Sequence, residues 1–306
     1  MANEVFYSSH GDLMLSAVLH QELQLLLADR SSIWGHPALV YLGDLQGAGS
    51  TTIKSAQAGL DGYDEMAAVS EGSSTSNTAL TDGSASATIA RQALQYQMSD
   101  LFGLVGANGL DPVRLAASMV GSASMRFTSM VAALASGFSQ SVGDTGVDMS
   151  VDDFFDADIT LSLSSNAAQR IAMLHPVQVS DLRTSLRAEG GAVQFMEATK
   201  EMLMTKGPGF VGTFLGVDIF NSSKCPLANS SADRAGMMFC REAIVYADGT
   251  PRPIVQANSI IVPAGSKIVV EFERDAAGAL TKVVGNYYVG VAVGQDLMGV
   301  GIVTDA

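Results

Sequence analysis

Two cysteines and four histidines are the residues of this chain that could supply a nucleophile, a general base or a metal ligand. Nucleophilic catalysis by cysteine commonly uses a thiol beside an imidazole, and Cys225 or Cys240 with His175 would provide that pair. Only the residue types support this hypothesis, because no local motif accompanies it. The two cysteines stand 15 positions apart, which matches no zinc pattern. We therefore expect buried free thiols, with a disulfide as the alternative.

The histidines are spread along the chain. His10, His20 and His36 form no H-x-x-x-H or H-E-x-x-H motif with one another or with His175. His175 is followed by Pro176 at the end of a predicted strand, where a buried, hydrogen-bonded histidine is the ordinary outcome. A catalytic role for His175 stays open as the less favoured interpretation.

Neighbouring carboxylates are the remaining candidates for chemistry. Such pairs could bind a hard cation, although solvated surface carboxylates are the more common case and no D-x-D-x-D-G loop occurs. The pairs are Asp64/Glu65, Asp152/Asp153 and Asp156/Asp158. We expect no catalytic, cofactor-binding or metal-binding residues, no cofactor and no enzyme activity.

Three glycines punctuate an apolar run, Gly209, Gly212 and Gly216. Their spacing differs from G-x-G-x-x-G, and the alternating residues 217–220 predict a strand rather than a helix after them, so a phosphate-binding loop is disfavoured. Glycines in such a run are typical of turns and of close backbone approach. The segment 209–226 is therefore expected to hold a turn and a short strand that ends in a loop near Pro226.

The elements that would position these residues follow from periodicity and punctuation. Asp111 and Pro112 are a strong helix start, and apolar residues at helical spacing predict about seven turns after them. Further helices are predicted over 12–29, 151–158, 166–171, 177–186 and 195–204. Strands are predicted over 171–174, 217–220, 236–247, 259–263, 267–274, 281–293 and 298–303, with a hairpin turn over 275–279.

Residues 46–88 differ in character from the rest of the chain, because Gly, Ser, Thr, Ala, Asp and Asn dominate them. Strand-like residues 51–57 and 84–94 bracket this segment. A loop of this length without its own core is uncommon inside a compact domain. We predict a long two-stranded arm that needs a neighbouring subunit to lie on, with a flexible linker as the alternative.

The composition limits the classes of function. Charged residues make up 16% of the chain, below the roughly 25% that is typical of globular proteins. The formal net charge is −14 and no basic cluster occurs, which disfavours a sequence reader of nucleic acid. The N-terminal residues lack a basic signal-peptide region, and the longest uncharged run, 127–143, is too short and polar for a membrane span. A cytosolic, reducing compartment is expected.

In this order, the segments resemble the major capsid proteins of tailed bacteriophages of the Hong Kong phage type. The resemblance rests on residues 62–66, 71–83, 90–94, 172–176, 209–226 and 269–278 as an ordered set. It implies an α+β phage capsid fold with an extended β-hairpin loop. The implied parts are an N-terminal arm (1–45), the extended loop (46–100), a peripheral domain with a long spine helix (101–150), an axial α/β domain (151–250), and the peripheral-domain sheet with a closing strand (251–306).

The resemblance also implies a function. The chain would self-assemble, as pentamers and hexamers, into the icosahedral shell around the double-stranded DNA genome of a tailed bacteriophage. It would enclose DNA without sequence-specific binding and without a membrane, in the virion, after assembly in the host bacterial cytoplasm. Scaffolding, portal and decoration proteins would be its partners. An encapsulin-like nanocompartment shell and a Cys/His hydrolase are the alternatives.

Two further expectations belong to the resemblance. Some members of this fold are cross-linked through a Lys of the extended loop and an Asn of a neighbour. Lys54 is the only lysine of this loop and Asn286 is a conceivable partner, with ordinary solvation and burial as the alternative. No long charged N-terminal stretch resembles a fused scaffolding segment, so the resemblance implies a separate scaffolding protein or earlier proteolytic removal.

Overall fold

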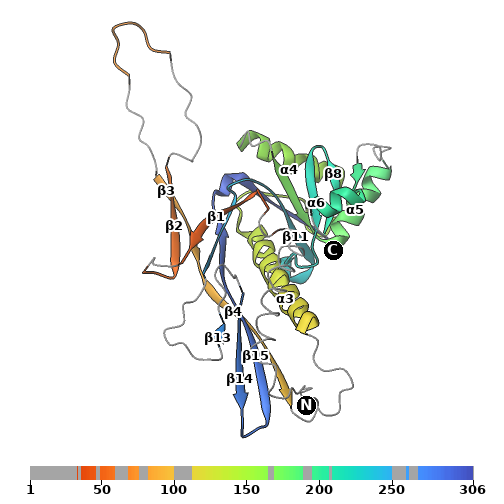
Figure 1. The fold of residues 1–306 in the computed structure, drawn as a ribbon. Coiled ribbons are helices and arrows are strands. Elements are labelled where there is room, and N and C mark those ends of the chain that lie inside the picture. Colours follow the sequence, from red (N-terminus) through yellow and green to blue (C-terminus); the bar gives the residue numbers. More distant parts are fainter. Residues whose placement is uncertain are drawn as a thin grey trace.

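The computed structural model describes most of the chain. The described residues are 33, 36–45, 49–58, 68–75, 82–99, 112–164, 169–188, 195–206, 209–249, 260–261 and 268–305. The predicted helix over 12–29 and the proposed cap Asp111 lie outside them. Within them the fold is mixed α/β and rich in strands (Figure 1).

Two larger sheets organise the described chain. The six-stranded sheet has the order β1-β12-β15-β14-β13, with β4 also paired to β15. Its strands are β1 (Leu39–Asp44), β4 (Ala90–Ser99), β12 (Ile244–Gly249), β13 (Ile260–Ile261), β14 (Ile268–Asp275) and β15 (Leu280–Val293). The long strand β15 therefore joins segments from three regions of the sequence.

The eight-stranded sheet has the order β5-β16-β11-β6-β9-β8-β7, with β10 also paired to β11. Its strands are β5 (Ser141–Val142), β6 (Arg170–Leu174), β7 (Phe195–Glu197), β8 (Phe210–Phe214), β9 (Val217–Asn221), β10 (Leu227–Ala228), β11 (Asp233–Cys240) and β16 (Gly299–Asp305). The predicted strands over 171–174, 217–220 and 298–303 are confirmed as β6, β9 and β16.

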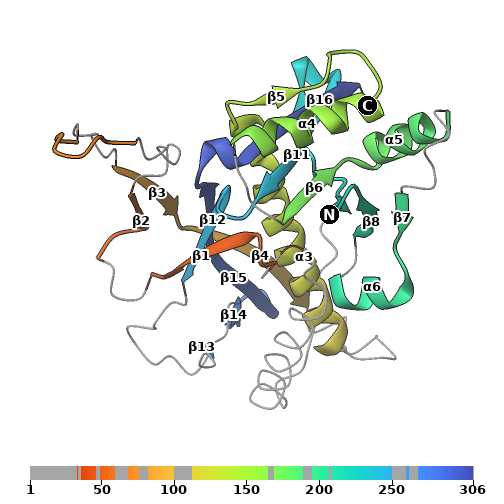
Figure 2. The same cartoon turned by 90° about the horizontal axis from the view of Figure 1, so that it is seen from above.

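Four α-helices lie in the described residues (Figures 1 and 2). They are α3 (Pro112–Ala132), α4 (Val151–Ser164), α5 (Pro176–Ala188) and α6 (Lys200–Lys206), and α3 continues as the 3-10 helix η1 (Ala133–Gly137). The predicted start of α3 at Pro112 is confirmed. At α4, Ser150 Oγ accepts from the Asp153 N–H while the Asp153 carboxylate accepts from the Ser150 N–H, which is a reciprocal cap.

The eight-stranded sheet is apolar on both faces. One face packs against α4 and α5 through side chains such as Phe154, Leu161, Leu182 and Phe214, all of which are buried. The other face shares a second core with η1, the end of α3 and the six-stranded sheet, in which Phe127 meets Tyr246. This second core joins the two sheets into one body.

The predicted strand over 236–247 is wrong as a single element. It is two strands, β11 and β12, which belong to different sheets. Between them Glu242 adopts a left-handed conformation, with φ of 80°. No glycine or proline marks this turn, and apolar residues lie on both sides of Arg241 and Glu242, so the pattern resembled one long buried strand.

Two helix predictions are also wrong in part. Residues 195–204 form the short strand β7 followed by α6, because the backbone of Phe195 to Glu197 pairs with β8. Residues 170–171, predicted to be helical, begin β6, while 166–168 lie outside the described residues. In both places pairing with distant strands overrides local helix propensity.

The arm predicted within residues 46–88 is paired as expected. Strands β2 (Thr52–Ala58) and β3 (Asp82–Thr88) form a two-stranded antiparallel sheet. Figure 1 shows these strands leading away from the six-stranded sheet, with residues 68–75 far from the body. Every residue of 68–75 is exposed.

Candidate functional site

The two cysteines are free and buried, as predicted. Burial raises the pKa of the Cys225 thiol to about 12, so this thiol stays protonated near neutral pH. His175 uses its Nδ1 to accept from the Val177 N–H at the start of α5. Among the described residues no hydrogen bond joins His175 to either thiol, so the geometry does not assemble a Cys/His dyad.

The carboxylate pairs are likewise placed for structure. Asp153 caps α4, and Asp158 pairs with Arg170 of β6. Asp152 and Asp156 are exposed on α4, and Asp64/Glu65 lie outside the described residues. In the part of the chain that the structure describes, no group of three or more His, Cys, Asp or Glu side chains could hold a metal ion.

A buried ion pair that the sequence analysis missed lies near His36. The Asp218 carboxylate, in β9, accepts from Lys206 Nζ at 2.5 and 2.6 Å and from Thr213 Oγ1 at 3.1 Å. Burial lowers the pKa of His36, whose ring contacts Phe220 edge-on at 5.5 Å, so the imidazole is neutral at neutral pH. The group holds no cysteine. The available signal was the single carboxylate in the apolar strand Val217–Asn221, which requires a partner.

We expect Asp218→Asn to lower the free energy of unfolding by about 1–3 kcal/mol, because Lys206 would lose its carboxylate in a partly buried site. Urea unfolding followed by circular dichroism measures the change. In a double-mutant cycle with Lys206→Met, the second substitution should recover part of the loss. Equal losses for Asp218→Asn in both backgrounds would contradict the coupling.

The glycine run folds as the sequence indicates. Leu215 and Gly216, with φ of 51° and 79°, form the turn between β8 and β9. At Gly212, the site of a register shift in β8, an added Cβ would lie 2.4 Å from the Met196 carbonyl oxygen. These glycines allow a turn and close strand packing, and a strand follows them, so the disfavoured phosphate loop is absent here.

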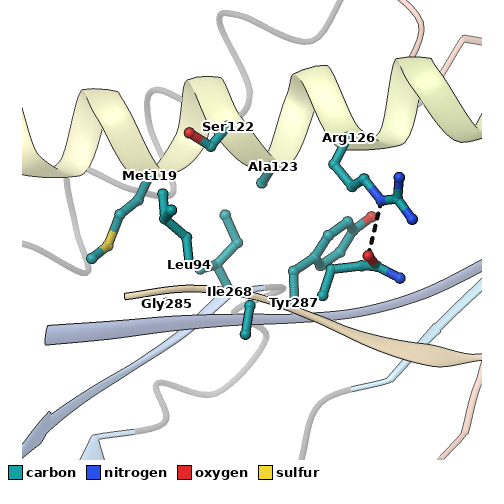
Figure 3. A pocket seen from close by; sticks show the side chains of 10 residues that line it. Leu94, Met119, Ser122, Ala123, Arg126, Ile268, Gly285 and Tyr287 are labelled. Carbon is teal, nitrogen blue, oxygen red and sulfur yellow. Dashed lines mark hydrogen bonds between the residues drawn. The ribbon is translucent and has the colours of Figure 1, made fainter. Parts of the chain in front are cut away.

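A cavity of about 290 Å³ lies between α3 and the strands β4 and β15 (Figure 3). Leu94, Met119 and Ile268 supply apolar walls, and a hydrogen bond of 2.9 Å from Arg126 Nε to Gln92 Oε1 lies toward one end. None of its described lining residues is Cys, His, Asp or Glu. The described lining of the cavity therefore offers no thiol, imidazole or carboxylate.

The base of the arm packs closely against the six-stranded sheet. Ala87 and Ile89 are buried against Ala247 of β12, and the Ile89 N–H donates to the Thr51 carbonyl at 2.9 Å. Where the arm crosses β15, an added Cβ on Gly290 would lie only 2.2 Å from the Thr88 carbonyl oxygen. The body therefore fixes where the arm begins and in which direction it leaves.

The two residues considered for a cross-link have different surroundings. Lys54 is exposed on β2. Asn286 is 1% exposed in β15, where its Oδ1 accepts from Arg91 Nε at 2.7 Å. The Asn286 amide thus lies inside the subunit, where a neighbour's lysine has no direct access.

The described side chains hold the body of the subunit together and position the arm. The two thiols are buried, and His175, Asp153 and Asp158 are bonded to their neighbours, while the arm projects from a well-packed body. A membrane-spanning helix is not found among the helices that the structure describes.

Comparisons with known proteins agree with this picture. No family model and no curated protein sequence matches the chain. A structure from Mycobacterium phage Che8 has a TM-score of 0.56 at 15% identity, covering 83% of this chain and 84% of its own. The capsid of cyanophage P-SCSP1u has a TM-score of 0.59 at 13% identity, covering 90% and 89%.

A third solved structure widens the comparison. The SrpI encapsulin complex of Synechococcus elongatus has a TM-score of 0.59 at 15% identity, covering 100% of this chain and 91% of its own. At such identities a likeness shows the fold alone, so the function is not settled by it. Most of these neighbours are phage capsid structures, and the chain therefore has the fold of tailed-phage major capsid proteins, which it shares with an encapsulin.

Proposed function

We propose that this chain is the structural subunit of the icosahedral capsid that encloses the double-stranded DNA genome of a tailed bacteriophage. The observation that carries the proposal is the two-stranded arm, which projects from a body of capsid fold. A two-stranded ribbon is at best marginally stable in water without a surface to lie on. A neighbouring subunit in a closed shell provides that surface.

The proposal assigns roles to the parts of the chain. Helix α3 is the spine helix of a peripheral domain, with the six-stranded sheet beside it. The eight-stranded sheet with α4 and α5 is the axial part, where copies meet in pentamers and hexamers. Within the extended loop of residues 46–100, the arm formed by β2 and β3 lies over the next subunit, while β4 belongs to the subunit's own sheet. The N-terminal arm expected over residues 1–45 lies mostly outside the described residues.

The proposed contents and partners follow from the same hypothesis. With a net charge of −14, the subunit encloses DNA without sequence-specific binding, which allows the packaged DNA to move and leave. Scaffolding, portal and decoration proteins are its partners in the virion. Assembly takes place in the host bacterial cytoplasm, with no membrane and no enzyme activity of the subunit.

Negative-stain electron microscopy of the purified protein, with size-exclusion light scattering on the same sample, tests the proposal. We expect closed shells, or rings of five and six copies. A protein that stays monomeric at every concentration, including under macromolecular crowding, would count against a shell subunit and would justify screens for hydrolase activity.

An encapsulin-like nanocompartment is the second candidate. The SrpI encapsulin match, which covers the whole of this chain as one of the capsid matches also does, supports it as a candidate. The contents of the shells discriminate, because a nanocompartment takes up a specific cargo protein whereas a capsid subunit encloses nucleic acid. Mass spectrometry and the ratio of absorbance at 260 and 280 nm on purified shells from the native source would report which is present.

Replacing both cysteines separates a shell from a Cys/His hydrolase. We expect Cys225→Ala with Cys240→Ala to assemble as the unchanged protein does, while losing about 1–3 kcal/mol of stability from buried volume. Electron microscopy reads assembly and thermal melting reads stability. His175→Ala serves as the parallel variant. Loss of a measured hydrolytic activity in both variants, with assembly unaffected, would revive the hydrolase.

A further inference from the structure

Helix α4 presents an unusual outward face. Asp152, Phe155, Asp156, Ile159 and Leu163 recur at helical spacing and are all exposed, whereas the opposite side of the helix is buried in the core. Ile159 is 53% exposed and Leu163 is 84% exposed, which is high for residues of this type. We call these five residues the acidic face. It combines an apolar stripe with two carboxylates and contains no Lys, Arg or His.

Two contacts define the edges of the acidic face. The ring of Phe155 packs against Phe214 of β8, with ring centroids 6.1 Å apart, so the stripe continues from the core to the surface. On the side of the helix, the Asp158 carboxylate forms an ion pair with Arg170, a neighbouring basic residue. The carboxylates of Asp152 and Asp156 have no ion pair within the described chain.

Helix α5 has an outward face of opposite character. Ser180, Arg183, Thr184 and Arg187 recur at helical spacing and are exposed, whereas Leu182 and its neighbours on the other side are buried. These four residues, here called the basic face, contain two guanidinium groups and no carboxylate. Neither arginine forms an ion pair with a described carboxylate.

The basic face also borders apolar surface. The Arg183 guanidinium lies 5.2 Å from the centroid of the Phe195 ring in β7. Met196, the next residue of this short edge strand, is 61% exposed. The two faces are therefore alike in having apolar surface beside charge, and they differ in the sign of the charge.

We propose that the acidic face of one copy of this chain packs against the basic face of a second copy. Charge sets the polarity of the contact. Packing α4 against α4 would bring carboxylates together, and packing α5 against α5 would bring guanidinium groups together, both of which are repulsive. Pairing α4 with α5 places two negative charges beside two positive charges. Each contact thus joins two different faces.

The consequence for assembly is geometric. Two copies could join both pairs of faces about a two-fold axis, but in the proposed ring each copy uses its acidic face toward one neighbour and its basic face toward the other, so further copies add until the ring closes. The inference rests on the proposed shell function and specifies which surfaces would join neighbouring copies within a ring. Apolar burial by Ile159 and Leu163 supplies attraction, and the charged side chains select the partner face.

Charge reversal tests the contact. One variant carries Asp152→Lys and Asp156→Lys, a second carries Arg183→Glu and Arg187→Glu, and a third carries all four substitutions. We expect each reversed face alone to raise the protein concentration for half-assembly at least tenfold. The variant with all four substitutions should half-assemble at a concentration close to that of the unchanged protein, because the attraction between the two faces is restored. Sedimentation velocity measures association whether or not shells close.

A matched control carries Asp144→Lys and Glu273→Lys, which add the same charge at exposed sites outside both faces. It should associate as the unchanged protein does. Thermal melting checks that each variant is folded, and the neutral variants Asp152→Asn/Asp156→Asn and Arg183→Gln/Arg187→Gln replace any that is not.

The outcomes separate the two proposals. If the unchanged protein forms no rings or shells, either alone or when expressed with the other assembly proteins of its source, the shell function fails. If it assembles and reversal of either face has no effect, the faces serve another partner and the present inference is overturned. The inference is also overturned if both single-face variants are folded and assemble poorly, and the variant with all four substitutions assembles no better than they do. A 1:1 mixture of the two single-face variants should associate in alternating, even-numbered rings only.

Discussion

Replacing residues 55–85 with an Asn-Gly turn should abolish shells while leaving a folded, soluble subunit. In the β2–β3 ladder Lys54 lies directly opposite Ser86, so a two-residue turn can close the hairpin there without a change of register. The retained residues Ile53, Ala87 and Ile89 keep their packing against Ala247. The deletion therefore removes the projecting part of the arm and spares its base.

The expected stability change is small, within about 1 kcal/mol, because residues 68–75 are exposed and the one deleted residue described as buried, Ala85, has a small side chain. Assembly should be lost, because the surface of the arm that would contact the neighbour is gone. Light scattering and negative-stain microscopy read assembly, and thermal melting reads folding. Intact shells of unchanged diameter from this variant would contradict the proposed role of the arm.

A shorter deletion provides the matched control. Ala58 and Asp82 are also directly opposite, so residues 59–81 can be replaced by the same Asn-Gly turn with β2 and β3 complete. We expect an effect between those of the unchanged protein and the longer deletion. A defect equal to that of the longer deletion would place the essential contacts in 59–81 alone.

Much of the fold could be predicted from the sequence, because local signals agreed with the tertiary structure. Pro112 and the apolar spacing after it predicted the long helix α3. The turn after Asp275 was predicted by its residues, and Asp275 Oδ1 accepts from the N–H groups of Ala277 and Gly278. The pairing of β2 with β3 followed from two strand-like segments that bracket a glycine- and serine-rich loop.

The errors arose where distant residues decide. The chain passes from one sheet to the other at Glu242, a left-handed residue without glycine or proline beside it, so the apolar residues on both sides concealed the change of sheet. Residues of β7 have a local preference for helix, and pairing with β8 overrides it. In both places the contacts that decide the structure are made with residues distant in the sequence. This separation, rather than a weak local signal, is the common cause of the wrong predictions.

The same reasoning explains what could be predicted about the site. Buried free cysteines followed from their number and spacing. The Lys206–Asp218 pair and the opposite charges of α4 and α5 did not, because each depends on which helix faces cover which strands. The outward positions of α4 and α5 become evident only when the buried positions are known.

Gly290→Ala should displace the base of the arm, whereas Gly285→Ala in the same strand should be tolerated. Both residues lie in β15, so the change in backbone preference is alike. At Gly290 the new Cβ would lie 2.2 Å from the Thr88 carbonyl oxygen and 3.0 Å from the Ile89 nitrogen, both backbone atoms. At Gly285 it would lie 3.3 Å from the Met119 sulfur, the flexible part of a side chain beside the cavity of Figure 3.

The two variants should therefore diverge in stability. We expect Gly290→Ala to cost about 1–3 kcal/mol through overpacking against backbone that has no rotamer with which to yield. Gly285→Ala should change stability by less than about 1 kcal/mol and could raise it, because alanine restricts the unfolded chain and fills part of the cavity. Urea unfolding at equal temperature compares them.

Shell assembly by the two variants tests whether the base of the arm sets its direction. If the base of the arm sets its direction, Gly290→Ala should impair shells more than its loss of stability explains, and a stabilising background should not rescue them. Gly285→Ala should assemble normally. Equal assembly by both variants, with Gly290→Ala less stable, would mean that the contact between Thr88 and Gly290 serves packing of the subunit and does not orient the arm toward its neighbour.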